Sequence, residues 1–293
     1  MRCRRSAAVP GASSMSQPPS SVLRRWLVVL APGLALYLAP LPGLDAGQRH
    51  LLALFAATIV ALVVRPVPMG VSVLVTMTLL SLTGTLPLTT VLSGFGNGTA
   101  WLVFCAFLFA RAVMTTGIGV RIAYFFIGRF GRTSLTLGYS VAISNLVLAP
   151  FVPSDTARGG GIIAPIIRSL AQALGSEPGP TGNRIGAYLT LVGFHCTYAA
   201  SAMFLTGMAA NPLIAEFAHK LAGVDLTWGR WALAALVPGL CTFAIVPWLL
   251  HQLNPPDLQD TEHARAHARE KLQRMGPMRT AEKKFVVVMF AVI

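Results

Sequence analysis

The chain has 293 residues, of which 54% are hydrophobic and only 11% are charged, and it carries a formal net charge of +13. This is far more apolar sequence than one soluble core of this size uses, so the composition excludes an ordinary soluble domain and predicts an all-α, polytopic membrane protein. The basic residues stand at the ends of apolar segments instead of on one periodic face, which argues against nucleic acid as a partner.

The N-terminal 25 residues, rich in Arg, Pro and Ser, predict a disordered basic arm. No small-x-small cleavage site follows the first apolar run at 26–44, so we expect a retained helix and not a cleaved signal peptide. The cysteines form no CxxC pair and indicate neither a zinc site nor a disulfide scaffold. They are Cys3, Cys105, Cys196 and Cys241.

A spanning helix needs about 20 mainly apolar residues, and fewer when flanking side chains snorkel. The apolar runs predict about six spanning helices, at residues 26–44, 51–64, 69–82, 101–118, 185–221 with an interruption, and 231–250. Between the fourth and fifth of these, residues 119–132 place aromatic and basic residues at helical spacing, which predicts an interfacial amphipathic helix. We expect a cytoplasmic linker at 254–283 and the start of a seventh, truncated membrane helix at 284–293.

The most informative segment is Pro153 to Gly161, a polar, glycine-tailed stretch between the apolar runs 135–152 and 162–174. Polar backbone at membrane depth is tolerated only where protein or a water-filled cavity surrounds it, so this pattern predicts a re-entrant hairpin facing an aqueous site. The positive-inside rule also favours a hairpin over a full membrane crossing. If the N-terminus is cytoplasmic, a hairpin leaves both Arg132 and Arg184 on the cytoplasmic side, as the rule requires.

Polar chemistry concentrates at the hairpin tip, where Asp155 is the only acidic residue between Asp45 and Glu177. An intramembrane charge costs about 2.5–3.5 kcal/mol on insertion scales, which favours a functional role for Asp155 over that of a helix cap alone. The hydroxyls of Ser154 and Thr156, with nearby carbonyl oxygens, suit a hard cation such as sodium. The helix start after them suits an anion.

Arg158 follows the tip and carries a planar guanidinium that can grip a carboxylate bidentately. We therefore count it among the candidate substrate-binding residues. A salt bridge to Asp155, or snorkelling of the side chain to the cytoplasmic surface, is the alternative interpretation.

A second interruption, Thr206 to Pro212, lies within the apolar run 185–221. Proline removes a backbone donor, so we expect freed carbonyls around Gly207, and broken helices of this kind bind ions and substrates in secondary transporters. Asn211 is the candidate substrate-binding residue of this segment. A plain proline kink is the alternative.

Other titratable groups carry weaker signals. His195 fits hydrogen-bonded packing better than a proton relay. His263 and His267, with Glu270 nearby, fit a solvated linker helix better than a metal site. An integral-membrane enzyme with Asp155 and His195 as an acid/base pair lacks a third, orienting group, so the sequence does not favour an enzyme.

The tip motif Ser-Asp-Thr-Ala-Arg at 154–158, followed by Gly160-Gly161, is similar to the Ser-Asn-Thr-Ala-Arg-x-Gly-Gly signature of the divalent anion/sodium symporters. It resembles most the branch of 2-oxoglutarate/malate translocators and citrate or succinate antiporters. Further matching segments lie at 92–95, 98–101, 109–111, 201–206, 209–212 and 228–238. The likeness covers about residues 51–284.

The resemblance implies an elevator-type homodimer, with scaffold helices at 26–132 and a moving transport part at 133–253. Separately, arginine outnumbers lysine by 19 to 4, which suggests a GC-rich bacterial genome and hence an inner (plasma) membrane. The resemblance also implies that Ser154, Asp155 and Thr156 bind sodium and the substrate carboxylate, and that a carbonyl near Gly207 completes the sodium site. The expected activity is secondary transport of di- or tricarboxylates, by exchange or by sodium symport.

Two departures from the family qualify this expectation. Asp155 stands where the family has Asn, which strengthens a cation site, introduces proton coupling or weakens dianion binding. No second hairpin follows, so we expect the chain to hold the first of two inverted repeats and not to transport by itself. A non-transporting remnant or membrane assembly partner is the alternative.

Overall fold

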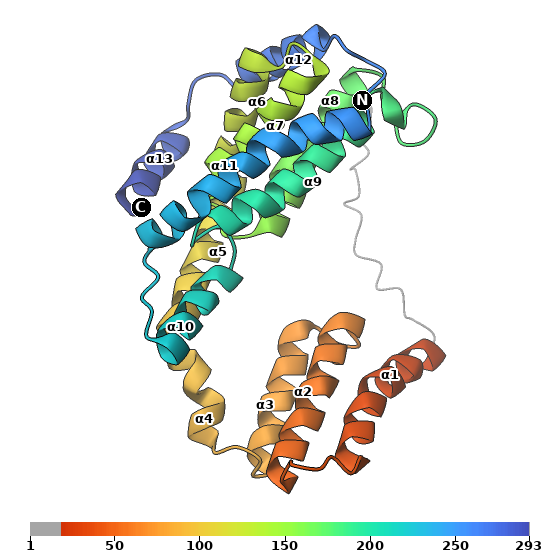
Figure 1. Ribbon diagram of the computed structural model, residues 1–293, viewed down its shortest axis with the longest axis vertical. Helices are drawn as coiled ribbons and strands as arrows, with labels where there is room; N and C mark the ends of the chain where they lie inside the picture. Colours follow the sequence, from red (N-terminus) through yellow and green to blue (C-terminus); the bar gives the residue numbers. More distant parts are fainter. Residues whose placement is uncertain (1–18, 293) are drawn as a thin grey trace, which may run out of the picture. The chain divides into compact units, whose positions relative to one another are not determined.

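The structure is a computed structural model that describes residues 19–292. Its regular elements in this range are thirteen α-helices, two short 3-10 helices and one π-helix, without a strand (Figure 1). The predicted all-helical fold is therefore confirmed. Most of the predicted disordered arm lies outside the described residues, while residues 19–25 form the first turns of α1.

The chain divides into two compact units, Met1–Gly96 and Asn97–Ile293. The first contains α1 (Pro19–Leu38), α2 (Ala46–Val64), α3 (Met69–Leu82), α4 (Leu88–Leu92) and η1 (Ser93–Gly96). Asp45 and Gln48 form a capping box that starts α2, and Arg65 ends this helix in the left-handed conformation with φ 52°. Residues 51–82 thus form two helices, as predicted. The predicted boundary between the scaffold part, 26–132, and the transport part, 133–253, is a functional one. The division into compact units does not test it.

The second unit contains the hairpin and the broken helix. Its elements are α5 (Gly98–Thr116), α6 (Ile118–Phe130), α7 (Ser134–Leu148), η2 (Thr156–Ile163), α8 (Ala164–Ala173), η3 (Gly182–Arg184), α9 (Gly186–Met203), α10 (Ala210–Ala222), α11 (Trp228–Leu253), α12 (Glu262–Arg274) and α13 (Thr280–Val292). Helix α9 packs on α7, α8 and α11, and α6 packs on α7 and α12 (Figure 1). The core lies among these helices, where Ile127, Leu137, Leu170 and Leu189 are fully buried.

Three of the described helices are long and apolar enough to cross a membrane, namely α2, α5 and α11. Helices α3 and α7 are apolar but shorter. Because short apolar helices also span when flanking residues snorkel, this pattern is consistent with a polytopic membrane protein. The number of six spans stays a prediction.

Helix α6 is the element predicted as an interfacial amphipathic helix. Its buried face is formed by Ala123, Tyr124 and Ile127, whereas Phe125 and Phe130 are exposed. The aromatic side chains that suggested the apolar face therefore point away from the protein core. The helix lies against α7 and α12, and its place at a membrane surface stays a prediction.

The linker after α11 folds back onto the C-terminal end of α6. Arg265 and Arg269 of α12 both donate from Nε to the carbonyl oxygen of Gly128, at 3.2 and 2.8 Å. A Cβ on Gly128 would lie 3.1 Å from Arg269 Cγ, so the glycine permits this close approach. The two guanidinium groups also complement the negative end of the α6 dipole.

The broken helix differs in detail from the prediction. Helix α9 ends at Met203 and α10 begins at Ala210, so the break covers 204–209 and starts before Thr206. Pro212 lies in the first turn of α10, where its missing N–H costs nothing, and so it does not sit in the break. The chain instead folds back tightly at Gly207, where a Cβ would lie 2.5 Å from the Ser201 carbonyl oxygen.

Candidate functional site

The hairpin tip begins with two side chains that cap η2. Ser154 Oγ accepts a hydrogen bond from Ala157 N at 3.2 Å, and Asp155 Oδ1 accepts one from Thr156 N at 2.8 Å. Ser154 and Asp155 are half-buried and Thr156 is exposed. The capping role considered for Asp155 is therefore present, and it uses one of the two carboxylate oxygens, Oδ1.

The segment after the cap is a π-helix containing three consecutive glycines, Gly159 to Gly161. π-Helical turns inside helices are frequent at functional sites. A Cβ on Gly159 would lie 3.0 Å from Thr197 Cγ2 of α9, whereas a Cβ on Gly160 would meet open space. The first glycine thus permits close packing on α9, and the second leaves the backbone accessible.

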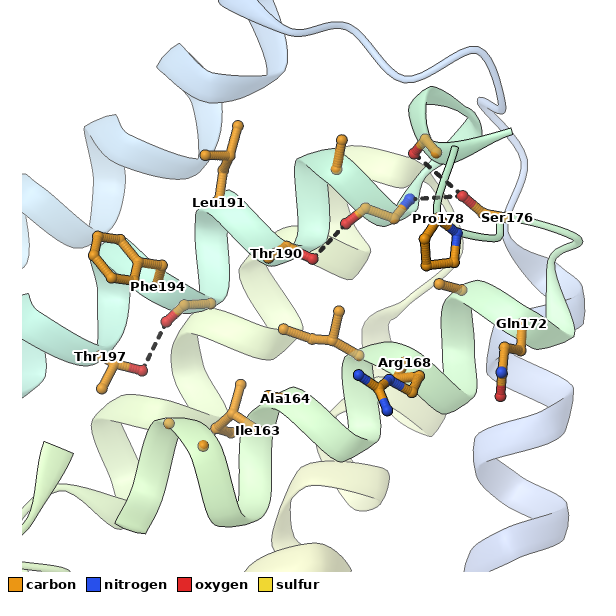
Figure 2. Close-up of a pocket in the computed structure, with 18 of the residues that line it drawn as sticks. Ile163, Ala164, Arg168, Gln172, Ser176, Pro178, Thr190, Leu191, Phe194 and Thr197 are labelled. Carbon is orange, nitrogen blue, oxygen red and sulfur yellow. Dashed lines mark hydrogen bonds between the residues drawn. The ribbon is translucent and has the colours of Figure 1, made fainter. Parts of the chain in front are cut away.

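A cavity of about 820 Å³ lies between the hairpin and α9. Figure 2 shows Ile163, Ala164 and Arg168 on the hairpin side of it, with Thr190, Phe194 and Thr197 on α9. Asp155, Thr156, Gly159 and Gly160 also line the cavity. Its volume falls within the range of small-molecule sites.

Only part of the predicted site faces this cavity. Asp155 and Thr156 line it, while Arg158, Gly207 and Asn211 lie elsewhere in the hairpin and the break. Sequence reasoning missed Arg168 and Thr190, which line the cavity as well. Arg168 is a charged residue within the apolar sequence of α8, and this contrast could have marked it as a candidate site residue.

Arg158 is fully buried and its guanidinium is directed at protein oxygens. Nη1 donates to the carbonyls of Val152 at 2.7 Å and Gly207 at 3.3 Å. Nη2 donates to the Thr197 carbonyl at 3.1 Å and to the Ser201 hydroxyl. The side chain does not reach the surface, and among the described residues it forms no salt bridge with Asp155. It joins the hairpin to α9 and to the break.

Asn211 is 3% exposed and serves the end of α9. Its Nδ2 donates to the carbonyls of Ser201 and Phe204, both at 2.8 Å. These carbonyls lie where α9 ends and regular helical partners are missing, so the amide satisfies them. In this conformation Asn211 shapes the break and does not face the cavity.

Thr206 connects the break to two other elements. Its hydroxyl donates to the Pro150 carbonyl at 2.9 Å and accepts from Trp228 Nε1 at 3.2 Å. The Trp228 ring stacks on Phe204 at 5.9 Å. Neither role was predicted, although both residues fall within segments that carried the family resemblance.

The remaining candidates do not assemble into a second site in the described part of the chain. His195 is exposed, and its Nδ1 bonds the Leu191 carbonyl of its own helix at 2.9 Å. Within residues 19–292, His195 forms no hydrogen bond with Asp155. His267 Nε2 lies 3.1 Å from Ser169 Oγ. No group of three or more possible His, Cys, Asp or Glu metal ligands occurs within residues 19–292.

Comparison with known proteins places these features in a family. Residues 20–293 match the family described as "Sodium:sulfate symporter transmembrane region". The Bacillus subtilis protein YflS, whose name assigns it provisionally as a malate transporter, is 47% identical over 91% of this chain and 56% of its own length.

Two further relatives have names that specify a transported class. The Arabidopsis thaliana protein "Dicarboxylate transporter 1, chloroplastic" is 40% identical over 98% of this chain and 54% of its own length. The Escherichia coli protein "L-tartrate/succinate antiporter" is 35% identical over 92% of this chain and 60% of its own length. The chain thus spans somewhat more than half the length of these relatives.

These matches confirm the family predicted from the tip motif, and they agree with the apolar helices in indicating a membrane protein. The chain belongs to the divalent anion/sodium symporter family, whose transmembrane region it matches over residues 20–293.

Proposed function

We propose that this chain is part of a secondary transporter of di- or tricarboxylates, and that the hairpin tip binds a substrate carboxylate. The observation that carries the proposal is the position of Asp155 and Thr156 on a cavity of about 820 Å³ beside a helix start. The names of the three relatives above support the substrate class.

The tip offers donors suited to a carboxylate. The positive end of the η2 dipole lies at Thr156, whose exposed hydroxyl donates or accepts as required. Gly160 lacks a side chain and borders the cavity, so a carboxylate can approach the backbone there. Ser154 contributes to this carboxylate site indirectly. Its hydroxyl caps η2 and so fixes the first turn, from which the donors project.

Exchange is the mode that the geometry favours over sodium symport. The Gly207 carbonyl, predicted as a sodium ligand, accepts a hydrogen bond from the Arg158 guanidinium. A fixed positive charge at that carbonyl repels a second cation there. A sodium site at Ser154, Asp155 and Gly207 is the second candidate, supported by the family resemblance.

The remaining features of the proposal rest on the family resemblance and on the sequence. The resemblance supports a homodimer and an elevator motion of 133–253 against 26–132. The high arginine content supports a bacterial inner membrane, and the positive-inside rule supports a cytoplasmic N-terminus. The repeat organisation belongs to the same proposal, in which this chain corresponds to the first of two inverted repeats.

Transport in liposomes tests the proposal. The chain is reconstituted by itself and as a chimera in which residues 1–283 precede the remaining C-terminal part of the Bacillus subtilis relative. Labelled succinate or malate is supplied to vesicles that are empty or preloaded with malate, with and without a sodium gradient. Exchange predicts uptake only into preloaded vesicles of the chimera, independent of sodium. Sodium-driven uptake into empty vesicles would favour symport.

Substitutions locate the site in the same assay. Ser154→Ala is expected to reduce uptake sharply, since it loses the cap at the binding turn. Ser169→Ala is the matched control, because Ser169 lies on the same hairpin but contacts His267 of α12 and does not line the cavity. Uptake by Ser154→Ala equal to that of the unsubstituted protein would remove Ser154 from the site.

A further inference from the structure

We infer that Thr206 is a positioning residue, which together with Gly207 holds the hairpin tip in its binding shape, and that Trp228 orients its hydroxyl. The inference rests on the proposed function, because it concerns the geometry of the proposed carboxylate site. It begins with the bonding capacity of one hydroxyl group.

A threonine hydroxyl has one hydrogen to donate and two lone pairs to accept. The Thr206 hydroxyl donates to the Pro150 carbonyl at 2.9 Å, and it accepts from Trp228 Nε1 at 3.2 Å. The indole N–H can only donate, so it forces the hydroxyl to act as its acceptor. The hydroxyl hydrogen is then left for Pro150, and Trp228 thereby fixes the direction of the second bond.

The Pro150 carbonyl needs such a donor. It follows the end of α7, where backbone carbonyls lack regular helical partners. The N–H of Ser154, four residues later, bonds instead to the Val152 carbonyl at 2.8 Å. In an apolar surrounding an unsatisfied carbonyl is costly, so the Thr206 hydroxyl holds the first side of the tip firmly.

The other side of the tip is held by the neighbouring residue of the break. Arg158 donates to the Gly207 carbonyl at 3.3 Å. Pro150 and Arg158 flank the tip residues on either side, and Thr206 and Gly207 are consecutive. Two adjacent residues of the break therefore hold the two ends of the tip, at Pro150 and at Arg158. The break thereby sets the distance between these ends, within which the cap at 154–156 forms.

Substituted forms of the full chain, purified in nanodiscs, test the inference. Thr206→Val keeps the shape of the side chain and removes the hydroxyl, while Thr206→Ser keeps the hydroxyl. Hydrogen exchange of backbone amides is measured at 150–158 and at 204–209. Thr206→Val is expected to accelerate exchange in both segments, and Thr206→Ser to leave both near the unsubstituted rates. Residues 46–82 serve as an internal control for folding.

Tryptophan substitutions test the orienting role. Trp228→Phe keeps a ring for stacking on Phe204 but removes the N–H, so it should accelerate exchange at 150–158 less than Thr206→Val does. The double variant should equal Thr206→Val, because both changes act through one hydroxyl. Trp231→Phe is the matched control, since Trp231 Nε1 bonds the Ala202 carbonyl of α9.

Succinate binding in the same samples completes the test. Thr206→Val should weaken binding about tenfold and Thr206→Ser less than twofold. Exchange that rises only at 204–209 in Thr206→Val, or equal damage by valine and serine, would overturn the inference. If the unsubstituted chain binds no succinate, the proposed function fails for this chain, and the exchange comparison still decides the inference.

Discussion

The backbone carbonyls of Arg132 and Arg184 are held by one short segment of the linker. Thr261 N donates to the Arg132 carbonyl at 2.9 Å, and Leu258 N donates to the Arg184 carbonyl at 3.1 Å. The chain therefore enters and leaves the region of the hairpin at the same end. This is the arrangement that a re-entrant hairpin requires.

We predict that cysteines at positions 132 and 184 react from the same side of the membrane. The linker binds the backbone of both residues, so neither substitution removes its contact, although Arg184→Cys also loses the hydrogen bond from Nη1 to the Gly175 carbonyl at 3.2 Å. The measurement is labelling by an impermeant maleimide in inside-out and right-side-out vesicles, in a background without the four native cysteines. Labelling from opposite sides would rule out a re-entrant hairpin and with it the proposed site.

Removing the Arg158 guanidinium should destabilise the protein strongly. Arg158→Gln removes a charged donor from the buried carbonyls of Val152, Gly207 and Thr197. The Val152 and Thr197 carbonyls keep a second donor, whereas the Gly207 carbonyl loses its side-chain donor. The expected loss is about 3 kcal/mol of unfolding free energy, since each unsatisfied buried group costs about 1–3 kcal/mol. Thermal unfolding in detergent measures it. Arg168→Gln, an exposed arginine on the same hairpin, should change stability by less than about 0.5 kcal/mol.

Substitutions of the tip glycines should separate packing from binding. A side chain at Gly159 collides with Thr197, so Gly159→Val should cost about 1–3 kcal/mol of stability. Gly160→Val places its side chain in the open cavity, so it should leave thermal unfolding nearly unchanged while it weakens succinate binding. Equal stability of the two variants would show that the hairpin does not pack on α9 in this way.

Replacing Asp155 by asparagine, the residue of the family signature, should strengthen substrate binding. The asparagine side-chain oxygen can accept from Thr156 N as the carboxylate does, so Asp155→Asn should keep the cap and the stability. It removes a negative charge beside an anionic substrate, so succinate should bind more tightly. Asp155→Ala should lose about 1 kcal/mol of stability with the cap. Weaker binding by Asp155→Asn would instead support a cation bound between Asp155 and the substrate.

Acid should loosen the linker through His267. Burial, followed by the positive charge of Lys271, lowers the pKa of His267, while Glu270 acts in the opposite direction. The unfolded state then binds protons more readily, so stability falls as pH drops through the ordinary histidine pKa near about 6.5. Amide exchange in α12 between pH 7.5 and 5.5 checks this. His267→Gln should flatten the dependence, and an unaltered pH profile in this variant would contradict it.

The sequence predicts some elements more closely than others, for physical reasons. The break between α2 and α3 was predicted because the apolar runs 51–64 and 69–82 are separate. The turn between α7 and α8 was predicted because its polar tip interrupts two apolar runs, and its re-entry into the membrane stays a prediction. The break between α9 and α10 was placed too late, since it depends on a backbone fold at Gly207 and not on Pro212. Such a fold depends on tertiary contacts that a local pattern does not contain.

The candidate site shows the same limit. The motif identified Asp155 and Thr156, which line the cavity, because polar residues in an apolar context are visible in sequence. It could not show that Arg158 points at carbonyls, because three of the four partners of the guanidinium lie 39 to 49 residues away. The roles of Thr206 and Trp228 depend on similar distant contacts. The substrate-binding roles of Ser154, Asp155, Thr156, Arg158 and Asn211 stay predictions.

The contact of Arg265 and Arg269 with the Gly128 carbonyl has a mechanical consequence. Helix α12 follows α11 in the chain, yet it is fastened to α6, which precedes the hairpin. The intervening polypeptide is thereby closed into a loop whose two ends meet at one glycine. A pull transmitted along the chain from α13 therefore reaches the contact of α12 with α6 before it reaches α11.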